Sequence, residues 1–163
     1  MDYEFQSIIQ EYITLICELL DIEEPALTFG GDFATPTAMA AYNPKMDLLF
    51  LNPEYCINNE QGILLMLYCV AHEIRHKWQY KSNNDAFSGY RRSNELSLKE
   101  YNSQWIEIDA NAFALAFMDC DFDDWDKIGL HNDLFQNKSV KERYSILLKE
   151  LNELLTEGGY YES

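Results

Sequence analysis

Four stretches of the chain are predicted to be helical, and the pattern of apolar and polar residues makes the first and the last of them amphipathic. The first stretch covers residues 3–20 and ends before Pro25. The other three cover about residues 59–80, 98–118 and 139–156. At 163 residues the chain is large enough to enclose a hydrophobic core.

Two of these helices carry recognisable end signals. Asn58 or Asn59 stands where the second helix needs an N-cap, since an asparagine side chain accepts hydrogen bonds from the first free backbone N–H groups. Residues 139–142 (Ser-Val-Lys-Glu) have the spacing of a capping box, and Gly158-Gly159 stops the last helix. These signals predict that the last helix begins at Ser139.

Between the first two helices the residue composition changes. Gly30-Gly31 and Pro36 interrupt short runs rich in β-forming residues. Such punctuation is typical of short strands joined by turns. The expected strands cover residues 27–29, 37–42 and 46–51, with a hairpin turn at 43–45. The predicted fold class is therefore α+β: one domain over residues 1–163, with a small, mostly antiparallel sheet of about three strands.

Two polar segments separate the later helices. Residues 81–100 form a long polar connection, and long connections of this kind often border a functional site. Residues 119–126 are strongly acidic and predict a solvated turn. Neither segment contains a repeat or a low-complexity tract, so no linker between domains is expected.

The net charge of the chain limits the classes of partner that it is expected to bind. The 163 residues carry a formal net charge of −16 at pH 7. Nucleic acids and anionic membranes are bound through clustered lysine and arginine, so neither is expected as a partner. A strongly acidic surface favours basic substrates or basic partner proteins.

Cysteine usage and the N-terminus predict a cytoplasmic protein. The four cysteines are widely spaced and include no CxxC pair, which is typical of reduced thiols and argues against a thiolate zinc site. The first residues are acidic and lack the basic region of a signal peptide. The longest apolar run, residues 63–71, is too short to span a bilayer.

The strongest chemical signal is the HExxH pentad His72-Glu73-Ile74-Arg75-His76, late in the second predicted helix. Residues four apart on a helix lie on one face with Cβ atoms about 5–6 Å apart. Two imidazoles at that spacing can bind one Zn²⁺ through bonds of about 2.0–2.1 Å. Glu73 borders the metal without taking a ligand position, so it can remove a proton from the attacking water. The pentad predicts a zinc hydrolase in which Glu73 is the base.

A catalytic zinc needs a third protein ligand, and Glu107 on the next predicted helix is the best candidate. Ala110 and Ala114 share its helical face and are small enough to let the two helices approach closely. Asn111, one turn after Glu107, is expected to hydrogen-bond a ligand imidazole from behind. Asp109 is a rival carboxylate on a different face and is interpreted as a solvated acid.

Four other polar residues are considered for roles at or around this site. Tyr90 and His131 are candidates for stabilising the oxyanion, although neither has a supporting spacing. Arg75 is expected to point away from the metal, either solvated or paired with an acid. Gln79 is expected to contact a loop or substrate, or to pack at the edge of the core.

The pentad and the later run Glu107-Ile108-Asp109-Ala110-Asn111-Ala112-Phe113-Ala114 together resemble the ImmA/IrrE-type zinc metallopeptidases. Members of that family carry HExxH and then a glutamate that opens an ExxANxFA-like helix. The likeness covers roughly residues 26–118, and its specific part is these two short motifs. The chain departs from the family at Arg75, where a small residue is usual, and in the segment after the glutamate helix.

The resemblance implies a zincin-like fold of the gluzincin type, with His72, His76 and Glu107 as zinc ligands and Glu73 as catalytic base. It also implies an intracellular peptidase that hydrolyses a protein or peptide substrate. Family members are often encoded by phages and other mobile elements, and some cleave a helix-turn-helix repressor, so a transcriptional repressor is one expected substrate.

Two readings from other functional classes stay open at this point. The chain could be a non-catalytic, zinc-containing interaction protein on a metallopeptidase fold, although a structural zinc has no use for a base beside it. Its acidic surface could instead mimic DNA and block a DNA-binding protein. The metallopeptidase reading is preferred because it explains His72, Glu73 and His76 together.

Overall fold

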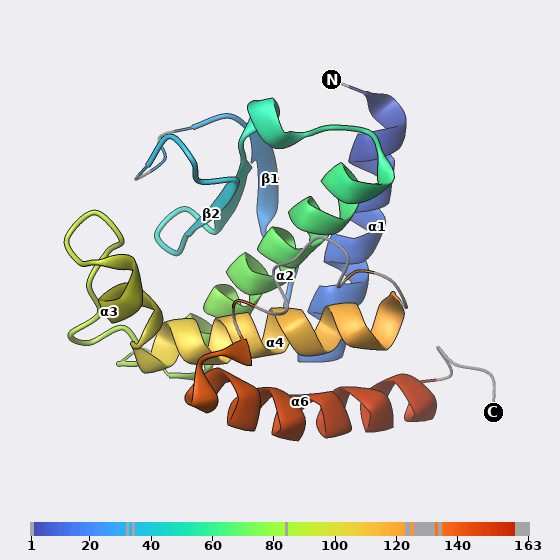
Figure 1. Ribbon diagram of the computed structural model, residues 1–163. Coiled ribbons are helices and arrows are strands. Elements are labelled where there is room, and N and C mark those ends of the chain that lie inside the picture. Colours follow the sequence, from blue (N-terminus) through green and yellow to red (C-terminus); the bar gives the residue numbers. More distant parts are fainter. Residues whose placement is uncertain are drawn as a thin grey trace.

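The part of the chain that the computed structural model describes contains five α-helices and one small sheet, and Figure 1 shows their arrangement. The described residues are 2–31, 33, 35–83, 85–122, 125, 133 and 135–158. In chain order the elements are α1 (Tyr3–Leu20), β1 (Ala26–Phe29), β2 (Ala40–Asn43), β3 (Leu48–Leu51), a 3₁₀ turn (Pro53–Tyr55), α2 (Glu60–Ser82), α3 (Leu98–Asn102), α4 (Trp105–Asp121) and α6 (Lys138–Glu157). The α+β class predicted from the sequence is confirmed.

The first helix has the predicted bounds, and its apolar stripe faces the core. Its buried side chains are Phe5, Ile9, Ile13, Ile16 and Cys17, spaced by three or four residues along one face. The side chain of Asp2 caps the helix by accepting hydrogen bonds from two backbone N–H groups. Helix α1 therefore packs with its apolar face against α2.

The three strands pair in the order β1-β3-β2, and the sheet is mixed. Strands β2 and β3 form the predicted antiparallel hairpin, whereas β1 runs parallel to β3. The expectation of a mostly antiparallel sheet is wrong for the pairing of β1 with β3. Strand β3 lies between β1 and β2, so the three strands do not form a simple meander. Residues 37–39 and 46–47 also lie outside the strands, so the hairpin turn is longer than predicted, at residues 44–47.

The helix that carries the pentad lies at the centre of the fold. Figure 1 shows α2 flanked by α1, β2 and α4, and it packs against all three. Its N-cap is Asn59, whose side chain accepts a hydrogen bond from the N–H of Gly62. The helix continues two residues beyond the predicted Tyr80, to Ser82.

An ion pair between a buried lysine and a half-exposed aspartate links α2 to the β2–β3 turn. The side chain of Lys77 is fully buried, and its Nζ lies 2.9 and 3.0 Å from the two carboxylate oxygens of Asp47. The hydroxyl of Tyr42 donates to the same carboxylate at 2.8 Å. These contacts hold β2 against the face of α2 that bears Glu73.

Two predicted helices begin or end elsewhere. The single helix expected over residues 98–118 is broken at Ser103 and Gln104 into α3 and α4, and α3 begins with a capping box made by Ser97 and Glu100. Helix α6 begins one residue before the predicted start, with Asn137 rather than Ser139 as its N-cap. Helix α4 also continues to Asp121, into the segment expected to be an acidic turn.

Helix α4 is buried on every side because it packs on α2 and on α6. All residues from Ile106 to Met118 are buried, and four of them are alanines that let neighbouring helices come close. An α-helix that is apolar all round is typical of a helix enclosed by others. Any polar side chain on α4 therefore needs a partner within the protein.

Two smaller expectations concern the cysteines and the membrane. Cys17, Cys56 and Cys69 are free thiols. Among the helices that the structure describes, none combines the length and the apolar character needed to cross a bilayer.

Candidate metal centre

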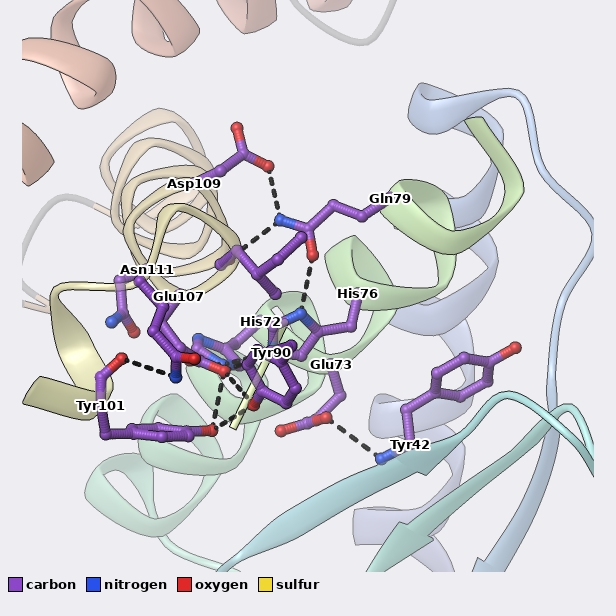
Figure 2. A network of polar contacts seen from close by, with 12 residues as sticks. Tyr42, His72, Glu73, His76, Gln79, Tyr90, Tyr101, Glu107, Asp109 and Asn111 are labelled. Atoms are coloured by element: carbon purple, nitrogen blue, oxygen red, sulfur yellow. Dashed lines mark hydrogen bonds and ion pairs between the residues drawn. The ribbon is translucent and has the colours of Figure 1, made fainter. Parts of the chain in front are cut away.

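Three side chains from two helices meet at one point between α2 and α4 (Figure 2). The Nε2 atoms of His72 and His76 lie 3.0 Å apart. The Nε2 of His72 is 3.0 Å from Oε2 of Glu107, and the Nε2 of His76 is 3.1 Å from its Oε1. The four-residue spacing in the pentad brings the imidazoles together, and the small residues of α4 let Glu107 reach them.

One oxygen of the Glu107 carboxylate has no hydrogen-bond donor inside the protein. Glu107 is fully buried, and its Oε2 has no hydrogen-bond partner, although His72 Nε2 is close to it. This 3.0 Å contact is an ion pair without hydrogen-bond geometry, so the oxygen has no donor. A buried carboxylate oxygen without a partner is rare because its desolvation is uncompensated.

The same atoms fit a metal ion. His72 and His76 also form a possible metal-binding group with the neighbouring Glu73, since each of these three offers a ligand atom within 4.8 Å of the others. Ligand atoms bound tetrahedrally at about 2.0–2.1 Å are separated by about 3.3–3.4 Å. The separations of 3.0 to 3.1 Å among the two imidazole nitrogens and the Glu107 oxygens are close to that value. A cation among them would satisfy the orphaned oxygen.

Gln79 determines which nitrogen of His76 faces this point. The Nε2 of Gln79 donates to the carbonyl of Ile106 at 2.9 Å and to Asp109 at 2.8 Å, so its Oε1 must be the acceptor that contacts His76. That oxygen lies 2.8 Å from Nδ1 of His76, which therefore carries a hydrogen. In the neutral ring, Nε2 then has its lone pair directed toward His72 and Glu107, as a metal ligand requires.

Glu73 lies beside the cluster and is held from the sheet. Its Oε2 accepts a hydrogen bond of 3.1 Å from the backbone N–H of Tyr42 on β2. Burial raises the pKa of Glu73, while the neighbouring imidazoles oppose that shift. A carboxylate with a raised pKa is better suited to accept and return a proton near neutral pH.

The charges of the three clustered groups are strongly coupled. Burial disfavours the charged form of Glu107, but the imidazoles of His72 and His76 outweigh it and hold its pKa well below the usual range. Burial also lowers the pKa of His76, yet the Glu107 carboxylate raises it to about 9. Without a metal, the carboxylate thus attracts a proton to the place where a cation would lie.

Comparisons of the chain with family models, with curated proteins and with solved structures found no match. The chemistry proposed for this centre therefore rests on the geometry of its own side chains. The resemblance carried by the two short motifs stays a prediction.

The structure brings together the residues proposed as ligands and base, and it reassigns several of their neighbours. Tyr90 lies at the centre, where its hydroxyl donates to Oε1 of Glu107 at 2.7 Å. The Oδ1 of Asn111 accepts from the hydroxyl of Tyr68 at 2.7 Å, and the contact with an imidazole expected of Asn111 is made by Gln79 instead. His131 lies outside the described residues.

The interpretation of Asp109 as a solvated acid is wrong. Only 2% of the residue is exposed, and its carboxylate accepts hydrogen bonds from Arg75, Arg143 and Gln79. The residue lies on a different face of α4 from Glu107, as expected, but α2 and α6 enclose that face as well. Arg75 is accordingly a buried, paired arginine.

Sequence reasoning missed two groups at this centre. Tyr101 donates its hydroxyl to Oε1 of Glu107 at 2.7 Å, and the backbone of Tyr42 holds Glu73. Neither residue has a spacing that relates it to the pentad. Only the position of Gln79, three residues after His76 on the same helix, could have suggested its contact with that histidine.

Replacing Gln79 by alanine is expected to weaken metal binding by about 10- to 100-fold, the usual effect of losing a hydrogen-bond partner behind a ligand histidine. Without Gln79, Nδ1 of His76 loses the acceptor that fixes its tautomer. The measurement is a competition titration with a chelator of known affinity. A matched control is Gln10→Ala, which removes an exposed glutamine that bonds Glu24 on the surface. Equal affinity in the Gln79 and Gln10 variants would contradict the assigned role.

Proposed function

We propose that this chain is a zinc-dependent peptidase in which His72, His76 and Glu107 bind the metal and Glu73 is the general base. The observation that carries the proposal is the unsatisfied Oε2 of the fully buried Glu107, beside two imidazole nitrogens 3.0 Å apart. Two nitrogens and one carboxylate oxygen form a common ligand set of catalytic zinc sites.

Zinc suits this set better than other common divalent ions. Calcium and magnesium prefer oxygen ligands, whereas imidazole nitrogens favour zinc and its transition-metal neighbours. A structural zinc site usually has four protein ligands, whereas here the two imidazoles and Glu107 take three positions and Glu73, close by, is assigned as the base. The fourth position would therefore be open to solvent or substrate.

When bound, zinc would make a water molecule more acidic and polarise the carbonyl group of the peptide bond. The protein residues supply the proton transfers. Glu73 accepts a proton from the attacking water and then delivers it to the departing amine, so one carboxylate acts first as base and then as acid. The Tyr42 N–H keeps the carboxylate of Glu73 beside the cluster throughout.

The substrate is proposed to be a protein or peptide with basic character. The net charge of −16 favours encounter with positively charged partners and disfavours nucleic acids. A transcriptional repressor fits this description because DNA-binding surfaces are basic. The likeness to ImmA/IrrE-type peptidases, carried by the pentad and the Glu107 helix, supports the same substrate class and a zincin-like fold.

Metal analysis combined with a proteome-wide cleavage screen tests the proposal. The purified protein is expected to contain about one zinc per chain, and it is expected to generate new peptide termini that vanish after chelation and return with added zinc. Bound zinc with no product and a tight, stoichiometric partner would favour the non-catalytic interaction protein instead. Binding of a basic partner that survives chelation would favour DNA mimicry.

Metal affinity should depend on pH in a defined direction. Below a pH of about 9, His76 is protonated in the metal-free protein, and the metal binds only the neutral ring. Apparent affinity is therefore expected to rise by about tenfold per pH unit below that value and then level off, with about one proton released per zinc from this residue at pH 7. Calorimetric titrations in buffers of different ionisation enthalpy measure the release. Binding at pH 7 without proton release would contradict the coupling between His76 and Glu107.

A further inference from the structure

Two tyrosines from the segment between α2 and α4 converge on one oxygen of Glu107. The hydroxyls of Tyr90 and Tyr101 each donate to Oε1 at 2.7 Å, and they lie 2.9 Å from each other. Figure 2 shows both phenol groups directed at the carboxylate, from the side opposite Asp109. The two hydroxyl protons account for both hydrogen bonds to Oε1.

The two oxygens of Glu107 therefore have different surroundings. Oε1 accepts two hydrogen bonds from phenols, whereas Oε2 accepts none. The carboxylate is fully buried, so solvent does not supply the missing partner. A carboxylate with one saturated and one vacant oxygen is prepared to bind a cation through the vacant one.

Packing against neighbouring groups restricts the movement of the two tyrosine side chains. The ring of Phe87 packs edge-on against Tyr90, with centroids 5.3 Å apart, and against His76, with centroids 5.8 Å apart. Tyr101 lies on α3, whose N-terminus is fixed by the capping box of Ser97 and Glu100. Both hydroxyls are thus presented by packed elements of the fold.

We propose that Tyr90 and Tyr101 are positioning residues that hold Glu107 as a one-oxygen metal ligand, bound through Oε2. The inference rests on the proposed zinc centre. Two hydrogen bonds to Oε1 oppose its turning toward the metal as a second ligand atom. A carboxylate that binds through both oxygens would occupy the coordination position that the reaction needs for water. The tyrosine pair keeps that position open.

The variants Tyr90→Phe and Tyr101→Phe and their combination test the proposal, because they remove only the hydroxyls. In the double variant we expect zinc affinity to fall by about 10- to 100-fold, measured by competition with a chelator. With cobalt in place of zinc, the visible spectrum is expected to change, since it reports the ligands and geometry of the metal and a second Glu107 oxygen would take the place of water. The control Tyr144→Phe removes a hydroxyl that donates to Asp119, away from the centre.

A cobalt spectrum in the double variant that matches the unmodified protein would overturn the proposal. X-ray absorption of the unmodified, zinc-loaded protein gives a second test that does not depend on the folding of a variant. A single Glu107 oxygen bound to zinc supports the inference, and two bound oxygens overturn it. Neither measurement requires cleavage of a substrate, so failure of the proposed peptidase activity is detected separately by the cleavage screen.

Discussion

Replacing Glu73 by glutamine is expected to leave metal binding intact and to lower turnover by about 10²- to 10⁴-fold, the usual contribution of a general base. Glutamine has nearly the same shape and keeps an oxygen that can accept the Tyr42 N–H. It cannot take a proton from water. Turnover is measured on the substrate that the cleavage screen identifies, and metal content is measured on the same samples.

The control for this variant is Glu60→Gln on the same helix. Glu60 lies in the first turn of α2, is exposed and is remote from the pentad, so its variant is expected to keep full activity. Loss of metal from the Glu73 variant would show that Glu73 is a ligand rather than the base. Unchanged turnover with full metal content would remove Glu73 from the mechanism.

Features determined by residues close together in sequence were predictable. The apolar repeat and the acidic cap of α1 lie within residues 2–20, and its predicted bounds are correct. The pairing of His72 with His76 follows from helical spacing alone. Glu107 lies much further along the chain than the pentad. Its position among small residues on a helix was nevertheless enough to predict that its carboxylate reaches the imidazoles.

Features that depend on distant partners were not predictable. Arg75 and Arg143 are each 34 residues from Asp109, and no local pattern relates them. Residues 98–118 are compatible with one continuous helix, but the chain breaks at Ser103 and Gln104, and Tyr101 faces Glu107. The parallel pairing of β1 with β3 likewise depends on how the intervening chain crosses the sheet. Tertiary packing decides these cases over local preference.

Removing the carboxylate of Asp109 is expected to destabilise the fold by about 3–5 kcal/mol, because it leaves a buried positive charge without its partner. Asp109 accepts hydrogen bonds from Nε and Nη2 of Arg75 at 2.8 and 3.1 Å. The side chain of Arg75 is only 5% exposed, and its guanidinium lies 3.7 Å from the centroid of the Trp78 ring. Water therefore cannot replace the lost carboxylate.

The electrostatics of Asp109 support the same expectation. Burial alone would raise its pKa, but Arg75, Gln79 and Arg143 outweigh burial and hold the pKa below its usual value. A carboxyl group whose pKa is lower in the folded state stabilises the fold above its unfolded pKa, and this contribution is lost as the pH falls through the folded pKa. The cost of Asp109→Ala should accordingly be largest near neutral pH and smaller in acid.

Urea unfolding of the metal-free protein measures this effect without a contribution from bound metal. Glu142→Gln is the control, because its pair with Lys138 is 3.7 Å long and well exposed, and such pairs contribute little to stability. Arg143→Ala is expected to have an intermediate effect, since 23% of that side chain is exposed. A double change of Arg75→Met with Asp109→Leu should recover part of the loss, because the buried charge disappears with its partner. If Asp109→Ala unfolds at the same urea concentration as the control, the ion pair does not stabilise the packing of α2 on α4.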